Sequence, residues 1–239
     1  MKAFILAAGR GTRISRYLSG KPKCTVDIGG IPLIRYTVDL LRSKGVTEIA
    51  LALGYNQQAI RDVLEGTGVK FYVNPFYDVT NSIASAWFAK DFLLGDDMLI
   101  MNGDVYLDET LLDLLLAEKK RPVMFADGSR KETADYKFYY PQGRLLKYGK
   151  ELQGDDITGE YIGLGLFAKD FMPHFVDRME EMIARQEHGV WWENVVYSMT
   201  EEDSIHVTDV RGNFWAEVDY IEDYDRILKH RGVERREME

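Results

Sequence analysis

Short apolar runs alternate with amphipathic segments through the first half of the chain. Four continuous runs are typical of strands buried on both faces of a sheet: 3–8, 48–53, 69–73 and 97–102. Four segments with helical periodicity follow them: 31–44, 56–65, 81–93 and 108–119. This βα alternation predicts an α/β fold with a mostly parallel, doubly wound sheet.

After residue 120 the apolar runs become shorter. Strands are predicted at 122–126, 134–140, 143–148 and 159–167. Because these strands follow one another closely, they indicate an antiparallel extension of the sheet. The remaining predicted elements are helices at 169–187 and 190–199, strands at 204–208 and 214–218, and a last helix from about 220. The sequence pattern contains no linker, so a single domain over 1–239 is predicted.

Charge and composition narrow the classes of partner. The net charge of −9 argues against nucleic acid and against an anionic membrane surface. No membrane insertion is expected, because no apolar run approaches the ~20 residues of a membrane helix. Cys24 is the one cysteine, which excludes an internal disulfide and favours a reducing compartment. The first strand begins directly after Met1-Lys2 without a signal-peptide pattern, so a cytoplasmic location is expected.

The turn after the first strand combines glycines with positive charge. It reads Gly9-Arg10-Gly11-Thr12-Arg13, and the segment from Arg10 to Lys23 holds five basic residues and no acidic one. Glycines let backbone N–H groups approach oxygen atoms closely, and the cationic side chains complement phosphate charge. The segment predicts a phosphate site with Arg13 and Lys23 near it. The alternative is a surface loop that happens to be basic.

Two known glycine motifs do not match this turn. The dinucleotide-binding fingerprint needs a third glycine where this chain has Ile14. The P-loop needs Ser or Thr where Pro22 follows Gly20-Lys21. Neither motif therefore accounts for the basic turn.

Two aspartates follow apolar runs at strand ends. Asp104 ends Met101-Asn102-Gly103-Asp104, and Asp219 ends 215–219. Ligands of open α/β sheets bind outside the carboxyl ends of the strands, so these carboxylates can face the basic turn. Mg²⁺ takes oxygen ligands and commonly one or two carboxylates, which makes Asp104 and Asp219 candidate ligands. The alternative is that each aspartate caps the helix that follows it.

Small residues open the helix predicted at 81–93, with Asn81 or Ser82 as its N-cap. Such a start exposes backbone N–H groups and short side chains that can bond the edge of a nucleotide base. A capped helix without a ligand explains the same residues.

Aromatic residues stand beside carboxylates at Glu160-Tyr161 and at Trp191-Trp192-Glu193. An aromatic face with a carboxylate nearby binds ammonium groups. Because adjacent tryptophans cannot share one helix face, one of the pair is expected in the core.

The chain resembles the nucleotidyltransferase superfamily that makes nucleotide-activated sugars and alcohols. The motifs that carry this resemblance are 6–13, Lys21-Pro22-Lys23, 29–34, Asn102-Gly103-Asp104 and Glu217-Val218-Asp219. More narrowly, it is similar to small cytidylyltransferases that act on phosphocholine and related phospho- or phosphono-compounds. This second similarity runs through 74–77, Asn81-Ser82, 159–163, 192–194 and 219–224. The resemblance implies a Rossmann-like, GT-A-like sheet.

The resemblance also implies a reaction and a set of residue roles. An oxygen of the acceptor attacks the α-phosphorus of CTP and pyrophosphate leaves, with Mg²⁺ as cofactor. Arg13 would bind the triphosphate, Lys23 the α-phosphate and the acceptor phosphate, and Asp104 and Asp219 the metal. The implied nucleotide-binding residues are Leu6, Ala8, Gly9, Gly11, Thr12, Asn81, Ser82, Ser85 and Asn102. The implied acceptor-binding residues are Glu160, Tyr161, Trp192 and Glu193.

These roles divide the domain into a nucleotide-binding part at about 1–120 and an acceptor-binding part at about 121–239. Two other functions stay open: a sugar-1-phosphate nucleotidyltransferase that uses dTTP or UTP, and a regulatory nucleotide-binding domain without turnover. The sequence does not distinguish a monomer from a homodimer.

Overall fold

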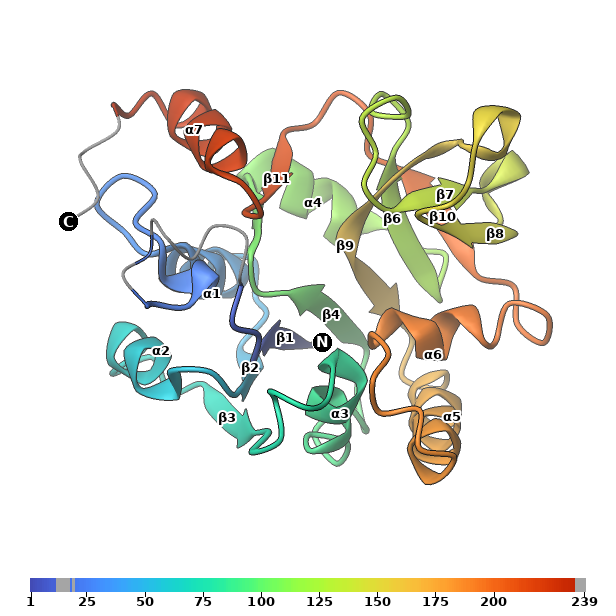
Figure 1. The fold of residues 1–239 in the computed structure, drawn as a ribbon, viewed down its shortest axis with the longest axis horizontal. Coiled ribbons are helices and arrows are strands. Elements are labelled where there is room, and N and C mark those ends of the chain that lie inside the picture. The colour runs from blue at the N-terminus through green and yellow to red at the C-terminus, as the bar shows by residue number, and fades with distance from the viewer. Residues whose placement is uncertain (12–17, 19, 235–239) are drawn as a thin grey trace.

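The computed structural model describes residues 1–11, 18 and 20–234, and a nine-stranded sheet forms the centre of this described chain (Figure 1). The strands of its main path are β1 (Lys2–Ala7), β2 (Glu48–Leu53), β3 (Lys70–Val73), β4 (Met98–Asn102), β6 (Val123–Asp127), β9 (Gly159–Phe167) and β10 (His206–Asp209). Their spatial order is β10-β6-β9-β4-β1-β2-β3. A hairpin of β7 (Lys137–Tyr139) and β8 (Lys147–Gly149) joins this path where β7 pairs with β9.

The predicted mostly parallel sheet with an antiparallel part is confirmed. β1 lies between β2 and β4 and is parallel to both, and β3 is parallel to β2. The antiparallel part consists of the strands that the sequence assigns to it, β6 to β9, and of the pairing of β9 with β4. β9 runs antiparallel to both β4 and β6, so β6 points the same way as β4, and β10 is parallel to β6. Two strands of the described sheet, β8 and β9, therefore run opposite to the others.

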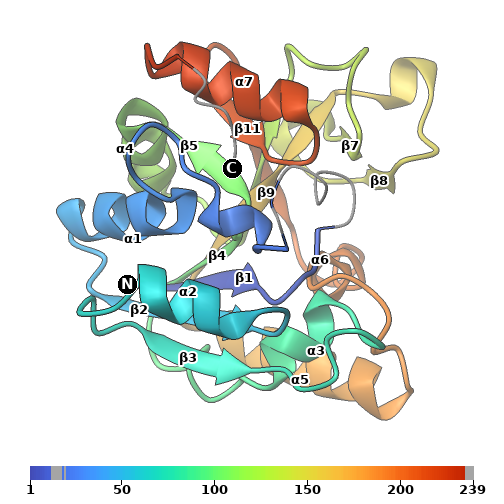
Figure 2. The same cartoon turned by 60° about the vertical axis from the view of Figure 1, so that its left-hand side comes forward.

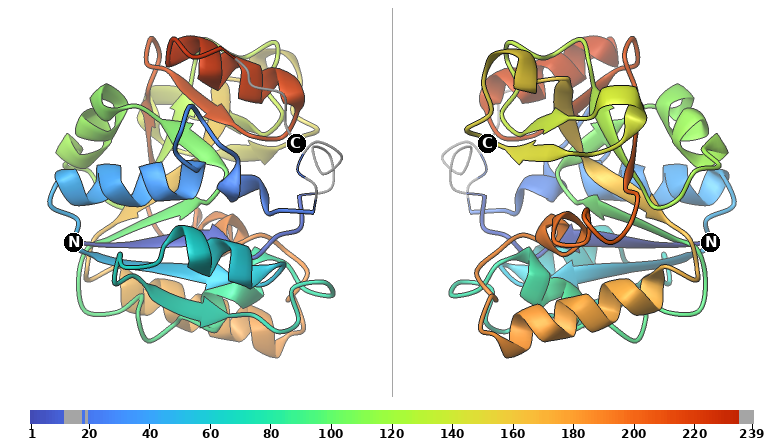
Figure 3. Two further views of the ribbon diagram at one scale, coloured as in Figure 1. Left: turned by 90° about the vertical axis from the view of Figure 1, so that its left-hand side faces the viewer. Right: turned by 90° about the vertical axis from the view of Figure 1, so that its right-hand side faces the viewer.

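Helices cover both faces of the sheet, as the doubly wound prediction requires (Figures 1 and 2). Figure 3 shows α1 (Leu33–Ser43) and α5 (Met172–Ala184) on opposite sides of the strands. Successive side chains of β1 point to opposite faces. Ile5 belongs to an apolar cluster with side chains of α1, α2 (Gln57–Val63) and α4 (Glu109–Ala117), whereas Phe4 belongs to one with side chains of α3 (Ser82–Trp87), α5 and α6 (Glu193–Tyr197).

A second, two-stranded sheet was not predicted. It pairs β5 (Val105–Leu107) with β11 (Trp215–Glu217) in antiparallel register, so Glu217 stands opposite Val105. The backbone N–H of Val218 then donates to the carbonyl of Asp104 at 3.0 Å. This pairing places the chain around 217–219 directly beside the end of β4. The last helix, α7 (Ile221–His230), packs on β11 through a third apolar cluster.

Helix caps settle one alternative raised by the sequence. Asp108 caps α4 by accepting from Leu111 N at 2.8 Å, and the N-cap of α7 is Tyr220. Neither Asp104 nor Asp219 is therefore an N-cap, so the helix-cap alternative to their predicted role as metal ligands does not hold. Asn81 caps α3, as predicted, but this helix ends at Trp87 and continues only as turns, so the prediction of a helix to residue 93 was too long.

The remaining regular segments are short 3₁₀ turns at Lys23–Thr25, Pro141–Gly143 and Gly154–Asp156. Within the described ranges, no helix has both the length and the apolar character needed to cross a membrane.

Candidate active site

The carboxyl ends of β1 and β4 open into a cavity of about 350 Å³. These strands are neighbours and parallel, so the turns that follow them lie together. Gly103 N donates to Leu6 O at 2.8 Å across the two turns. A Cβ at Gly103 would lie 2.9 Å from the same oxygen, so the close approach of the two backbones requires glycine here.

The predicted nucleotide-binding residues gather at this cavity, as far as they are described. Thr12 and Arg13 lie outside the described residues. The others all line the cavity: Leu6, Ala8, Gly9, Gly11, Asn81, Ser82, Ser85 and Asn102. They come from the ends of β1 and β4 and from the start of α3.

Gly11 supports the side chain of Lys23. Gly11 has a φ of +63°, and a Cβ there would lie 2.7 Å from Lys23 Cε. The lysine stem therefore lies on the glycine backbone, where a side chain would displace it. Lys23 itself opens a 3₁₀ turn after Pro22, and this turn aims the side chain into the cavity. The glycine turn at 9–11 and the Lys21-Pro22-Lys23 motif are thus in direct contact at the cavity.

Lys23 bonds both predicted metal ligands. Its Nζ lies 3.2 Å from Asp104 Oδ2 and also donates to Asp219 Oδ1. All three side chains are largely buried, with exposed fractions of 14%, 20% and 18%. Burial by itself would lower the pKa of Lys23, but the charges of Asp104 and Asp219 outweigh it and hold the pKa above its usual value. The lysine is therefore a permanent cation in this cavity.

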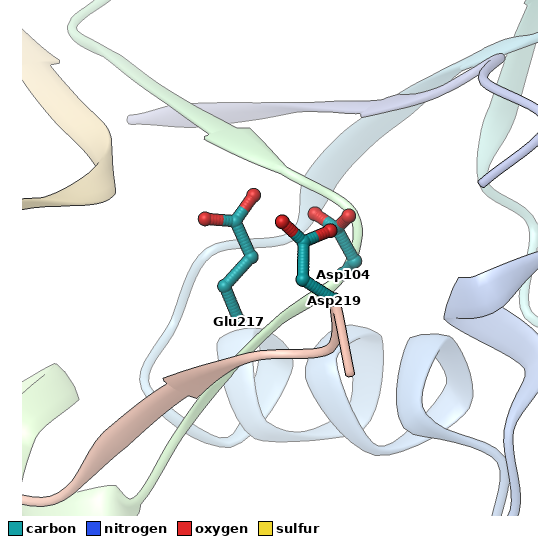
Figure 4. Close-up of side chains that lie close together, drawn as sticks. All are labelled: Asp104, Glu217 and Asp219. Atoms are coloured by element: carbon teal, nitrogen blue, oxygen red, sulfur yellow. The ribbon is translucent and has the colours of Figure 1, made fainter. Parts of the chain in front are cut away.

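Glu217 joins the two aspartates and was missed by the sequence analysis (Figure 4). One carboxylate oxygen from each of Asp104, Glu217 and Asp219 lies within 4.8 Å of the others. Burial, followed by the charges of Asp104 and Asp219, raises the pKa of Glu217 well above its usual value. The signal that could have found it is its spacing, because residues 217 and 219 on one extended segment point to the same side.

This donor set fits a divalent metal. Three clustered carboxylates offer hard oxygen ligands, and Mg²⁺ takes such ligands and completes its shell with water and phosphate oxygens. A cation here would also relieve the repulsion that raises the pKa of Glu217. The residues that would hold the ion are Asp104 and Asp219, with Glu217 beside them.

The start of α3 is both capped and open to the cavity. Asn81 Oδ1 accepts from Ser82 N at 2.8 Å, and Ser82 Oγ accepts from Trp192 N at 2.9 Å. Buried Asn74 donates to Ser85 Oγ and Thr80 Oγ1, each at 3.0 Å. These bonds fix the orientation of a small polar surface opposite the glycine turn.

The other end of the cavity is formed by aromatic rings around one buried carboxylate. Tyr136, Tyr161, Trp191 and Tyr197 line it together with Glu193. Glu193 is 6% exposed, and its Oε1 accepts from Asn102 Nδ2 at 3.3 Å. Among the described residues, Glu193 forms no ion pair with a lysine, arginine or histidine. Burial disfavours the ionised form of such a carboxyl group, so a positively charged ligand that pairs with it would be complementary to this end of the cavity.

Two of the predicted acceptor-binding residues are engaged in contacts within the protein. Trp192 is fully buried and does not line the cavity; its Nε1 donates to Asn102 Oδ1 at 3.0 Å. This confirms that one tryptophan of the pair is in the core, and corrects the choice of Trp192, because Trp191 is the one at the cavity. Glu160 does line the cavity, but its carboxylate accepts from Arg130 Nε at 2.5 Å and from Asp135 N at 2.8 Å.

Glu193 is expected to make stability depend on pH. Burial raises its pKa from 4.5 to about 7, so the unfolded chain ionises while the folded carboxyl is still protonated. The stabilising difference is present below pH 4.5 and is lost as pH rises toward 7. Relative to Glu193→Gln, the wild type is expected to lose up to about 3 kcal/mol of unfolding free energy between these limits. Urea unfolding of both proteins at pH 4.5 and pH 8 measures it.

The matched control for this measurement is Glu151→Gln, since Glu151 is exposed and should follow the wild type at every pH. Identical pH dependence in the wild type and Glu193→Gln would contradict the burial argument.

Comparison with known proteins places the chain in a family. The family model for the MobA-like NTP transferase domain matches residues 3–163. The chain is 26% identical over 250 aligned positions to CTP:phosphoglutamine cytidylyltransferase of Campylobacter jejuni, covering 94% of this chain and 98% of that protein. It is also 26% identical over 240 positions to choline-phosphate cytidylyltransferase of Streptococcus pneumoniae, covering 96% and 99%.

A solved structure shares the fold. The CTP:phosphocholine cytidylyltransferase of Streptococcus pneumoniae superposes with a TM-score of 0.81 at 24% identity, covering 96% of this chain and 98% of that chain. The family match extends over β1 to β9, which includes Lys23 and Asp104. The chain belongs to the MobA-like NTP transferase domain family and is a nucleotidyltransferase.

Proposed function

We propose that this protein is a cytidylyltransferase that transfers CMP from CTP to the phosphate or phosphonate of a small acceptor with a cationic head group. The observation that carries the proposal is one cavity that joins Lys23 and three carboxylates to the buried Glu193, which forms no ion pair within the described ranges. Two relatives that align along nearly their whole length are cytidylyltransferases by name, which supports CTP as the nucleotide.

In this proposal the nucleotide occupies the part of the cavity built by residues 1–120. The turn from Ala8 to Gly11, with Arg13, holds the triphosphate. The polar start of α3, at Asn81, Ser82 and Ser85, faces the base. Residues from 121–239 supply most of the acceptor site, where Glu193 attracts the head group and Tyr161 forms part of the wall. The acceptor phosphate then lies between the head-group site and Lys23.

The chemistry is one in-line displacement. An anionic oxygen of the acceptor forms a bond to the α-phosphorus of CTP, the bond from that phosphorus to the bridging oxygen breaks, and pyrophosphate carries the electron pair away. The acceptor oxygen is already ionised, so no general base is required. Lys23 would donate charge-assisted hydrogen bonds to both phosphoryl groups and reduce the repulsion between two anions that must approach.

A divalent ion belongs to the proposal, with Mg²⁺ as the expected species. Asp104 and Asp219 would hold it, and Glu217 stands beside them. The ion would neutralise charge on the triphosphate and on the leaving pyrophosphate. The carboxylates keep their positions through the β5–β11 pairing and the turn after β4.

Two competing functions are less well supported. A sugar-1-phosphate acceptor carries no cation that could pair with the buried Glu193, and both carboxylate oxygens of Glu160 are already engaged by Arg130 and Asp135. A regulatory domain without turnover has no need of the three carboxylates beside Lys23. Neither function accounts for a buried carboxyl group at Glu193 that has no cationic partner among the described residues.

A pyrophosphate-release screen tests the proposal. CTP, dTTP, UTP and GTP are each combined with phosphocholine, 2-aminoethylphosphonate, glucose 1-phosphate and inositol 1-phosphate in the presence of Mg²⁺. Release is expected with CTP and a cationic acceptor. Release with dTTP or UTP and glucose 1-phosphate would select the sugar enzyme, and no release with any pair would favour the regulatory domain.

A further inference from the structure

We propose that the acceptor's head group is a protic ammonium, with at least one N–H, and not a quaternary ammonium. The inference rests on the proposed function, which leaves the kind of cation open. It is carried by two tyrosine hydroxyls at the head-group end of the cavity and by the way the surrounding ring faces are used.

The hydroxyls of Tyr161 and Tyr197 are buried and lack hydrogen-bond partners within the described chain. The two side chains are 7% and 2% exposed, and both line the cavity. Glu193 lies near enough that, after burial, its charge helps to raise the pKa of each tyrosine. The Tyr161 hydroxyl lies close enough to Glu193, and the Tyr197 hydroxyl to Tyr136, for a hydrogen-bonding contribution to their pKa values, but neither contact has the distance and angles of a formed hydrogen bond. Buried polar groups without partners are costly, so a ligand that bonds them gains affinity.

A protic ammonium satisfies these groups, whereas a quaternary ammonium does not. The N–H groups of the ligand can donate to a tyrosine oxygen and to the Glu193 carboxylate, while the tyrosine O–H donates to that carboxylate. A trimethylammonium group has no N–H to donate. Its methyl groups would also keep water away from both hydroxyls, which would then have no hydrogen-bond partner. A site built for hydrogen bonds discriminates strongly against an analogue that lacks the donors.

The ring faces that a quaternary ammonium requires are already covered in part. Tyr197 stacks on Tyr148 and Tyr136, with ring centroids 4.1 Å and 5.9 Å apart. Tyr161 stacks on Phe138 at 4.9 Å. Cation–π binding uses free ring faces, so these two tyrosines offer mainly their hydroxyls to a ligand.

The ring of Trp191 already has a cationic side chain of the protein beside it. Lys150 Nζ lies 5.9 Å from the centre of the Trp191 ring and pairs with Asp135 Oδ2 at 2.7 Å. Both charged side chains line the cavity beside the tryptophan. The most exposed ring of the site is thus already associated with an ammonium group of the protein, which disfavours a second one on the same ring.

A methylation series at the acceptor nitrogen tests this inference with the intact protein. The kcat/KM with CTP is measured for phosphoethanolamine, its N-methyl and N,N-dimethyl forms, and phosphocholine, which differ only in their N–H groups and bulk. We expect kcat/KM to fall along the series, with phosphocholine at least ~10-fold below phosphoethanolamine. A value for phosphocholine equal to or above that for phosphoethanolamine would overturn the inference.

Two variants connect the preference to the hydroxyls. Tyr197→Phe and Tyr161→Phe should fold normally, because each removes a buried unpaired group. Each is expected to lower kcat/KM for phosphoethanolamine and to bring the ratio between the two acceptors closer to one. Tyr140→Phe is the matched control, since its hydroxyl is also buried and unpaired but does not line the cavity. An unchanged acceptor ratio in both cavity variants would refute the role of the hydroxyls.

Calorimetry keeps this inference separate from the proposed function. If no acceptor supports pyrophosphate release from CTP, the proposed function fails, and dissociation constants of the four phosphate esters are measured directly. Tighter binding of phosphoethanolamine than of phosphocholine would still support a protic head-group site. Equal binding, or tighter binding of phosphocholine, would reject it.

Discussion

Replacing Lys23 with alanine is expected to lower kcat by at least ~10²-fold, the loss typical of removing a preorganised charge donor. The Lys23 ammonium lies 3.2 Å from Asp104 Oδ2 and also bonds Asp219, so it is held where two phosphoryl groups are proposed to meet. Its stem rests on Gly11, which fixes the position of the charge before substrates arrive. Steady-state kinetics of pyrophosphate release, with CTP and the best acceptor, measure the loss.

Two further variants separate this role from damage to the fold. Lys23→Arg keeps the charge but changes its shape from a point to a planar fork, so partial recovery of kcat is expected. Lys70→Ala removes an exposed lysine that pairs with Glu48 at the far end of the sheet, and its kinetics should match the wild type. Thermal unfolding confirms that each variant is folded. A Lys23→Ala enzyme with nearly wild-type kcat would reject the proposed role of this side chain.

The sequence was sufficient to predict the sheet edge that carries the site. Continuous apolar runs predicted β1 and β4, and the polar residues that follow them were expected at one edge because parallel strands end together. The structure brings Lys23, Asp104 and Asp219 together at that edge. Strand order alone places Asp104 beside the turn after β1, whereas Asp219 reaches the same edge through the pairing of β11 with β5.

The second sheet was not predictable in the same way. β5 has three residues, Val105–Leu107, and a run this short before a helix resembles the first turn of that helix. Its pairing with β11 joins segments more than 100 residues apart, which local periodicity does not report. That pairing brings Glu217 and Asp219 beside Asp104, and before the structure only the spacing of residues 217 and 219 could have pointed to Glu217.

The sequence predicted that aromatic and carboxylate side chains form the acceptor site, but not which of them line the cavity. Adjacent tryptophans point in different directions, and sequence alone does not tell which one is buried; the structure buries Trp192 and leaves Trp191 at the cavity. The carboxylate of Glu160 is engaged by Arg130, a partner 30 residues away that no motif indicates. Tertiary packing decides such assignments.

Replacing Asp219 or Asp104 with asparagine is expected to weaken divalent-ion binding and to lower kcat by at least ~10²-fold. Each change removes a charge from the set of three carboxylates that lie within 4.8 Å of one another. Chelation with EDTA should abolish activity in the wild type, and added Mg²⁺ should restore it. Asp156→Asn removes an exposed carboxylate that pairs with Lys147, and it should change neither activity nor metal affinity. Activity that survives chelation would remove the carboxylates from the proposed mechanism.

Metal titration without nucleotide distinguishes the lysine from the aspartates, although both kinds of variant are expected to lose turnover. In the structure the Lys23 ammonium pairs with both Asp104 and Asp219 and offsets part of their negative charge. A divalent ion must therefore compete with it, so Lys23→Ala is expected to bind Mn²⁺ more tightly than the wild type, whereas Asp219→Asn binds it more weakly. Electron paramagnetic resonance of free Mn²⁺ measures both constants. Shifts in the same direction would mean that the lysine and the metal do not share these carboxylates.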